Sequence, residues 1–255
     1  MALTTNITAY WKLDEASWNA ADSVWTSTWV NVWTIGFATG KIWNGITNNY
    51  TNDKYLSCGT NVINGAETSI SLWFKIPSAN TQVSNLFTIM GNNTNERILI
   101  WVSTASAGKI SVYAVNKSPQ WRHTGTTSVN DWNRHHIVVV YASATVKVYL
   151  DWNTWTPEVN VSSSWSLATS SLWIYIGGRY YSVSTYSFNW NIDEVWVRDR
   201  VLTTAEVTQL YNGGAWLTYP FVSTNIKSAN GVLKASIKSK NGTVNANIKS
   251  RNWVA

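Results

Sequence analysis

Two polar segments of the chain bring together the aromatic, amide and guanidinium groups that bind sugars. One is the run at residues 92–95, and the other lies at residues 179–189. Aromatic faces stack on sugar rings, while amides and charged groups form hydrogen bonds with the hydroxyls. Tyrosine-rich loops are also ordinary solvent-facing turns, so a plain structural role stays open. The candidate ligand-binding residues are Asn92, Asn93, Arg179, Tyr180, Tyr181 and Tyr186.

The acidic and histidine residues do not form a catalytic pattern. A glycosidase needs two carboxylates at a fixed separation across the sugar bond. The 13 Asp and Glu residues are scattered, and the densest acidic stretch, residues 193–199, does not have the alternating spacing that such a strand requires. The three His residues show no metal-ligand spacing. The sequence therefore predicts a binding protein rather than an enzyme.

The net positive charge of the chain comes from its C-terminal end. Residues 1–224 carry 13 basic and 13 acidic side chains, whereas residues 225–255 carry the other six basic side chains and no acidic one. The main part of the chain is therefore neutral and does not have the basic face that nucleic-acid-binding proteins use. We expect no nucleic-acid partner and interpret the tail as a solvated segment.

The chain divides into a domain at residues 1–220 and a repetitive basic tail at residues 221–255. Ile-Lys-Ser recurs every eleven residues, at positions 226–228, 237–239 and 248–250. Three repeats this short cannot bury a core of their own. The tail is either a flexible linker or a segment that forms strands when copies or chains stack, and the sequence leaves both readings open.

Short segments of alternating apolar and polar residues recur through the domain. In residues 68–76, for example, Ile70, Leu72 and Phe74 face one side. Many such segments with polar turns between them predict an antiparallel sandwich or barrel. The expected strands lie at residues 68–76, 97–103, 109–115, 136–141, 145–151, 172–177 and 191–197.

One short helix is expected after the last strand. Thr203 and Glu206 form a capping-box pattern, and Gly213 with Gly214 supply a left-handed stop. Val207 and Leu210 would form its apolar face. We expect this helix to cover an open edge or end of the sandwich.

Tryptophan is used in an unusual way in this chain, because 18 Trp outnumber 14 Gly. In the tail, Trp253 stands where the first two repeats have Gly231 and Gly242. A positive φ costs an ordinary residue about 1–2 kcal/mol and costs glycine almost nothing. One hypothesis is therefore that many of these positions are glycine, encoded by UGA codons that the source organism reads as glycine. The alternative is a genuinely tryptophan-rich binding surface.

The hypothesis distinguishes two groups of tryptophans. Trp11, Trp73 and Trp101 lie inside strand patterns and are expected to be genuine, and Trp121 is left undecided. The positions expected to be glycine are 18, 25, 29, 33, 43, 132, 152, 155, 165, 173, 190, 196, 216 and 253.

Six motifs in residues 8–214 resemble, in order, those of the laminin-G-like family of concanavalin A-like jelly rolls. They are the opening strand at 9–15, and the segments at 52–56, 69–75, 135–138, 148–152 and 192–203. Each motif alone is weak, but six in the same order, spread over about four fifths of the chain, are a strong signal. The sequence departs from the family at Arg134, where the family prefers Trp, and at Arg198, where an aromatic residue is usual.

The resemblance implies an all-β fold, a two-sheet antiparallel jelly-roll sandwich with one short C-terminal helix. It also implies a non-enzymatic lectin-like domain that binds a glycan or a cell surface, often with a calcium ion. Calcium takes several hard oxygen ligands. Asp14, Asn52, Asp53 and Asp193 would supply them if the first and last strands are neighbours; otherwise Asp14 and Asp193 cap turns or pair with basic residues.

The N-terminal residues do not have the pattern of a signal peptide, and no segment is long and apolar enough to insert into a membrane. Together with the short Asn-Gly repeats, this favours a component displayed on a phage virion or another extracellular structure, with virion proteins as partners of the tail. The alternative is a purely structural decoration or fibre protein that binds no glycan.

Overall fold

A computed structural model describes most of the domain and four short strands of the tail. The described residues are 3, 5–16, 20–24, 30–32, 35–49, 54–58, 62–63, 67–78, 83–90, 97–103, 107–115, 121–142, 145–151, 153, 156–162, 173–178, 188–215, 217, 228–229, 232–233, 239–240 and 243–244.

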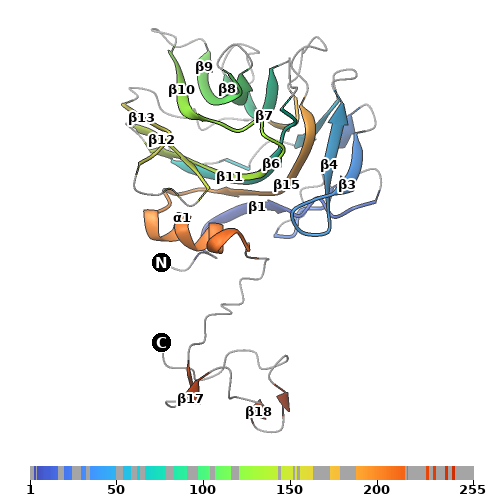
Figure 1. Ribbon diagram of the computed structural model, residues 1–255, viewed down its shortest axis with the longest axis vertical. Coiled ribbons are helices and arrows are strands. Elements are labelled where there is room, and N and C mark those ends of the chain that lie inside the picture. Colours follow the sequence, from blue (N-terminus) through green and yellow to red (C-terminus); the bar gives the residue numbers. More distant parts are fainter. Residues whose placement is uncertain are drawn as a thin grey trace.

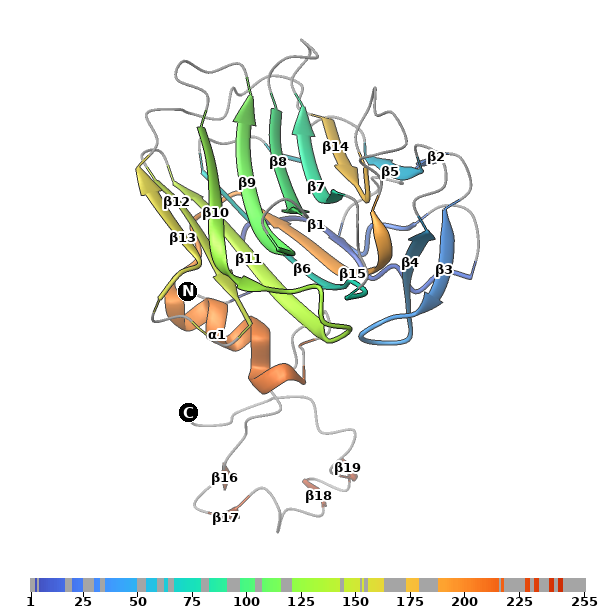
Figure 2. The same ribbon diagram turned by 45° about the horizontal axis from the view of Figure 1, so that its top comes forward.

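Two antiparallel sheets face each other across a hydrophobic core (Figures 1 and 2). Sheet A has the order β13 (Val159–Ser162), β12 (Thr145–Leu150), β11 (Arg134–Ala142), β6 (Thr68–Lys75), β15 (Asn189–Arg198), β4 (Asn44–Asn49) and β3 (Gly36–Thr39), with β1 (Ile7–Trp11) also paired with β15. Sheet B has the order β10 (Trp121–Ser128), β9 (Lys109–Val115), β8 (Arg97–Ser103), β7 (Ser84–Met90), β14 (Trp173–Ile176), β5 (Tyr55–Cys58) and β2 (Val30–Val32). This confirms the expected two-sheet sandwich.

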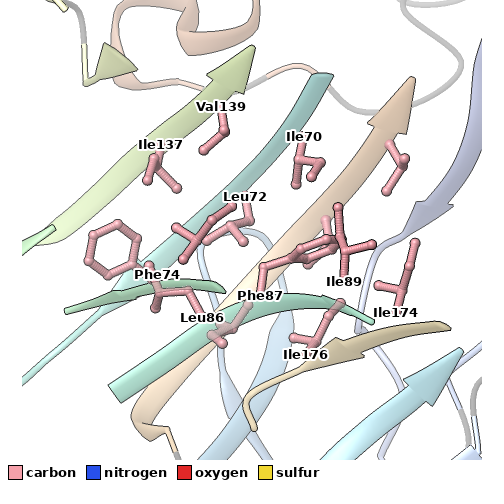
Figure 3. Close-up of a cluster of buried hydrophobic side chains, with 14 of the residues drawn as sticks. Ile70, Leu72, Phe74, Leu86, Phe87, Ile89, Ile137, Val139, Ile174 and Ile176 are labelled. Atoms are coloured by element: carbon pink, nitrogen blue, oxygen red, sulfur yellow. The ribbon is translucent and has the colours of Figure 1, made fainter. Parts of the chain in front are cut away.

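The core is formed by the inward residues of both sheets, as their period of two requires. Figure 3 shows Ile70 and Leu72 of β6 beside Ile137 of β11, facing Phe87 of β7 and Ile174 of β14. All five side chains are at most 3% exposed. The alternation of apolar and polar residues that predicted these strands therefore arises because one face of each strand is buried.

The first and last strands of the domain are neighbours, as the calcium hypothesis requires. β1 pairs with the second half of β15, where Trp11 lies opposite Val195. The register of β15 against β6 shifts between Asp193 and Trp196, and Glu194 in this bulge has φ 54°. A bulge bends a strand and redirects the side chains beside it. Here it lies at Asp193, one of the predicted ligands.

The helix α1 (Thr204–Tyr211) begins with the expected capping box. The Thr203 hydroxyl accepts a hydrogen bond from the Glu206 amide, and the Glu206 carboxylate accepts one from the Thr203 amide. The left-handed stop begins one residue earlier than expected, because Asn212 already has φ 48°. A short 3₁₀ turn, η3 (Asn212–Gly214), follows.

The helix covers a face of sheet A, not an edge or end of the sandwich as predicted (Figure 1). Val207 and Leu210 pack against Val138, Val140 and Tyr149, the outward residues of β11 and β12. The outer face of sheet A is apolar at these positions, so it needs a cover. The helix supplies that cover.

In the tail the described residues form two short antiparallel pairs. Each pair flanks a two-residue Asn-Gly step, which is a strong hairpin signal. The strands are β16 (Ser228–Ala229) with β17 (Val232–Leu233), and β18 (Ser239–Lys240) with β19 (Thr243–Val244).

Candidate functional site

Polar side chains gather at one end of sheet A, around the turn that joins β3 to β4. The elements that meet there are this turn, the segment after β1, the beginning of β11 and the bulge of β15. We call this set the rim cluster, and it consists of Asp14, Lys41, Asn44, Arg134, Asn191 and Asp193.

Asp193 fixes the turn of the rim cluster. Its Oδ2 accepts hydrogen bonds from the backbone amides of Lys41 and Ile42, the latter at 3.0 Å, and its Oδ1 accepts one from Glu194. The turn comes this close because Gly40 has no side chain: a Cβ there would lie 2.4 Å from Asp193 Oδ2. Asp193 thus caps this turn.

Asp193 is nevertheless in an unfavourable place for a negative charge. Burial raises its pKa to about 7, and the nearby charge of Asp14 adds to this effect, although the amides of Ile42 and Lys41 oppose it. Burial also raises the pKa of Asp14. A positive charge placed between the two carboxylates would favour the ionised form of both.

Asp14 is joined to the same turn through Asn44. The Asn44 side-chain amide donates to the Asp14 carbonyl oxygen at 3.1 Å, and the Asn44 backbone amide lies 3.4 Å from Asp14 Oδ1. The structure therefore brings two of the four predicted calcium ligands, Asp14 and Asp193, to one end of sheet A. The other two, Asn52 and Asp53, lie outside the described residues.

Arg134 joins β11 to the opposite side of the rim cluster. Its guanidinium donates to Asn191 Oδ1 at 2.6 Å and to the Thr39 carbonyl oxygen at 2.7 Å. Burial lowers the pKa of Arg134. Where the family prefers Trp, this chain thus places a half-buried cation with its planar donor fork at the surface.

His135, next to Arg134, lies between two carboxylates. Its Nδ1 is 2.9 Å from Asp151 Oδ2 and its Nε2 is 3.0 Å from Asp131 Oδ1. A neutral imidazole carries only one N–H, so both contacts are hydrogen bonds only when the ring is protonated. Burial alone would lower the pKa of His135, but the hydrogen bonds and charges of Asp151 and Asp131 raise it.

Two exposed aromatic rings flank the rim cluster. Trp43 is 80% exposed, and Trp132 is 42% exposed with the Lys75 ammonium 5.5 Å from its ring centroid. Trp73 contrasts with them, because it is buried on the outer face of sheet A with the Lys41 ammonium 4.3 Å from its centroid. Exposed rings beside polar groups are the chemistry of a sugar platform, provided that they are truly tryptophan.

The six predicted ligand-binding residues, Asn92, Asn93, Arg179, Tyr180, Tyr181 and Tyr186, lie outside the described residues. Their attachment points are described. Residues 92 and 93 follow β7, which ends at Met90 opposite Trp173, whereas residues 179–186 follow β14, which ends at Ile176 opposite Phe87. The chain therefore leaves these two neighbouring strands from opposite ends.

The sequence interpretation missed Lys41 and Asn191 and treated Arg134 only as a departure from the family. It also missed the carboxylates around His135, although a signal was present. The expected strands at residues 136–141 and 145–151 pair so that Ile137 lies opposite Leu150, which places Asp151 beside the two histidines. The Lys41 and Asn191 contacts had no such signal, since they cross about 150 and 60 residues of sequence.

Asp193 in the rim cluster and His135 beside it are both engaged in contacts within the protein. Both nitrogens of His135 contact carboxylates, and Asp193 is held by backbone amides. Among the described residues, no three His, Cys, Asp or Glu side chains are grouped to hold a metal ion. The helix in the described part of the chain is not long or apolar enough to cross a membrane.

The family described as the concanavalin A-like lectin/glucanases superfamily, of the laminin G type, matches residues 50–208. No curated protein matches the sequence.

Solved structures share the fold at low sequence identity. Domain 4 of AbnA, an extracellular GH43 arabinanase of Geobacillus stearothermophilus in complex with arabinotriose, has a TM-score of 0.65 at 18% identity, over 80% of this chain and 97% of that one. The binding domain of Paraclostridial Mosquitocidal Protein 1 has a TM-score of 0.65 at 13% identity, over 84% and 53%. Trypanosoma rangeli sialidase has a TM-score of 0.59 at 12% identity, over 82% and 32%. The chain thus spans nearly all of the first structure, half of the second and a third of the third.

Proposed function

Since the chain belongs to the laminin-G-type family of the concanavalin A-like lectin/glucanases superfamily, we propose that it is a non-enzymatic domain that binds carbohydrate. The observation that carries this proposal is the match to the arabinanase domain in complex with arabinotriose, because it covers 97% of that domain. The toxin binding domain has the same fold, which agrees with a binding role. The sialidase is three times as long as the matched region, so its activity does not transfer to this chain.

The rim cluster is the part of the proposed ligand surface that lies within the described residues. Arg134 and Lys41 are half-buried donors, and Asp14 is a half-buried acceptor. Such groups can form hydrogen bonds with the hydroxyls of a sugar and hold it without catalysing a reaction. Asn92 and Arg179 are proposed as separate ligand contacts, because they follow β7 and β14 at opposite ends of these strands. Trp43 and Trp132 are not included, because their backbone conformation favours glycine.

A glycan array tests the proposal. The full chain is expected to bind at least one class of immobilised oligosaccharide, and Arg134→Gln is expected to weaken this binding by about tenfold, the loss of one charge-assisted hydrogen bond. Lys147→Gln, on β12 away from the rim cluster, is the matched control and should bind like the native chain. A folded chain that binds no glycan would contradict the proposal.

Calcium is proposed as a ligand of the same end of sheet A. Asp14 and Asp193 would contribute carboxylate oxygens. The raised pKa of Asp193 supports the proposal, because a bound cation would favour the ionised form of both carboxylates. Adding calcium is expected to raise the thermal midpoint of the native chain, with a smaller shift in Asp193→Asn. Equal shifts in the two proteins would contradict a role for Asp193.

The site of action is proposed to be the surface of a phage virion or another extracellular structure. The basic repeats of the tail support contacts with other virion proteins, and a structural decoration protein without a glycan is the alternative function. Deletion of residues 221–255 separates the two. Loss of assembly with glycan binding retained fits the first, whereas loss of assembly in a chain that never binds glycan fits the second.

A further inference from the structure

The backbone at Trp43 has the conformation of a glycine. Residues 40–43 form the four-residue connection between β3 and β4, in which the Gly40 amide donates to the Trp43 carbonyl oxygen at 2.9 Å. Trp43 is the last residue of this connection and has φ 52°. Hairpin connections commonly place one residue in the left-handed region before the second strand, and glycine is preferred there.

Trp132 repeats this situation at an independent turn. It has φ 67° and lies between Asp131 and Asn133, whose backbone amide donates to Asp131 Oδ1 at 2.8 Å. An Asp side chain that closes a turn in this way is commonly followed by glycine. A bulky residue with positive φ is a genuine outlier, and here two of them are tryptophans.

The rings at these two positions are also unusually exposed to solvent. Trp11 and Trp73 are at most 2% exposed, whereas Trp43 and Trp132 are 80% and 42% exposed. Tryptophan is usually well buried because its large apolar surface stabilises the fold only when it is removed from water. A strained backbone and an exposed ring at the same residue therefore both argue against tryptophan.

The composition and the tail point the same way. The chain has more Trp than Gly, and Trp253 takes the place of the glycine in the first two tail repeats. In those repeats the Asn-Gly step lies between paired strands. The backbone conformation and the repeat pattern are independent observations.

We infer that residues 43 and 132 are glycine in the protein as its own cells make it, because UGA codons there are read by a glycine-accepting tRNA. The cell that makes this protein must then supply such a tRNA, and a standard translation system ends the chain at the first UGA. The inference does not depend on the proposed glycan binding.

The inference does not extend to every tryptophan for which the sequence suggested glycine. Trp196 is fully buried, stacks on Tyr10 with ring centroids 3.7 Å apart and does not have a positive φ. Trp173 lies in β14, also without a positive φ. The backbone gives no argument for glycine at these two positions.

Two direct measurements test the inference. The gene is expected to have UGA at codons 43 and 132 and UGG at codons 11 and 73. Tryptic peptides of the protein from its source should show glycine at residue 43 in peptide 42–54 and at residue 132 in peptide 123–134, with tryptophan at residue 73 in peptide 55–75 as the internal control. UGG codons or tryptophan masses at 43 and 132 would overturn it.

Recombinant variants test the backbone argument separately. Trp43→Gly and Trp132→Gly are each expected to raise the denaturant midpoint of the full chain, because they remove a strained conformation. Trp73→Gly is the matched control and should lower the midpoint, because it empties a buried site. Losses at 43 and 132 as large as the loss at 73 would overturn the argument, whatever the outcome of glycan binding.

Discussion

Glu206 and Asp193 are two buried carboxylates that accept backbone hydrogen bonds, yet their pKa values are shifted in opposite directions. Burial alone would raise the pKa of Glu206, but hydrogen bonds from Arg200 and Thr203 lower it to about 2. Burial raises the pKa of Asp193 to about 7, although hydrogen bonds from three backbone amides act to lower it. The difference lies in the direct ion pair. Arg200 holds Glu206 with two contacts of 2.8 and 2.9 Å, whereas Lys41 and Arg134 act on Asp193 through their charges and Asp14 opposes them.

The comparison shows what each carboxylate does for the fold. At the helix start, the Glu206 carboxylate is paired with Arg200 and accepts a hydrogen bond from the Thr203 amide, so its ionised form stabilises the structure. At the rim cluster, the amides orient the carboxylate but do not offset its desolvation. The ionised carboxylate is thus favoured at the helix start and disfavoured at the rim cluster.

The largest expected effect comes from removing the cation at the helix. Arg200→Ala leaves Glu206 buried without its partner and is expected to lower the free energy of unfolding at pH 7 by about 3 kcal/mol, because an uncompensated buried charge remains. Chemical denaturation measures the loss. In the Arg200→Ala, Glu206→Gln double variant, part of the loss should return, and purely additive losses would contradict the pairing.

A pH-dependent effect is expected at Asp193. Since its folded-state pKa of about 7 lies above the ordinary value of 3.8, the folded state binds more protons between these pH values, and stability falls as pH rises. Asp193→Asn should remove this slope. Its amide offers one accepting oxygen instead of two, so at least one of the backbone hydrogen bonds is also lost at every pH. Asp199→Asn is the control and should keep the slope. A slope that survives in Asp193→Asn would assign it to another group.

The smallest expected effect on stability comes from His135. This side chain reverses the comparison, because here a cation lies between two carboxylates. Its raised pKa means that its contribution is complete below pH 6.5 and is lost as pH rises through the folded-state pKa. His135→Gln should therefore abolish the loss of stability that the native chain shows as pH rises above 6.5. Titration of the ring by NMR gives the pKa directly, and a value at or below 6.5 would contradict the geometry.

The sequence predicted what depends on local pattern. The capping box at Thr203 and the strand at residues 68–76 were both correct, because each is defined by neighbours in the sequence. The prediction that the helix covers an edge or end of the sandwich was wrong. The helix lies on the face of sheet A because it packs on outward residues of strands that precede it by about 60 residues, and a local pattern does not show this contact.

The candidate site was predicted only in part, for the same reason. Asp193 and Asp14 were singled out by residue type and by the resemblance, and they do lie at one end of sheet A. Their contacts with Lys41 and Asn44 depend on the bulge in β15 and on the missing Cβ of Gly40, which have no signature in the sequence around them. The candidate ligand segments at 92–93 and 179–186 stay predictions.

The central position of β15 has a consequence for how the protein is made. This strand lies between β6 and β4 and also pairs with β1, yet it is the last strand of the domain to leave the ribosome. Until residue 198 is synthesised, β6 and β4 each present an unpaired edge, and such edges are prone to join with other chains. We therefore expect sheet A to close late and in one step, with incomplete chains especially dependent on chaperones.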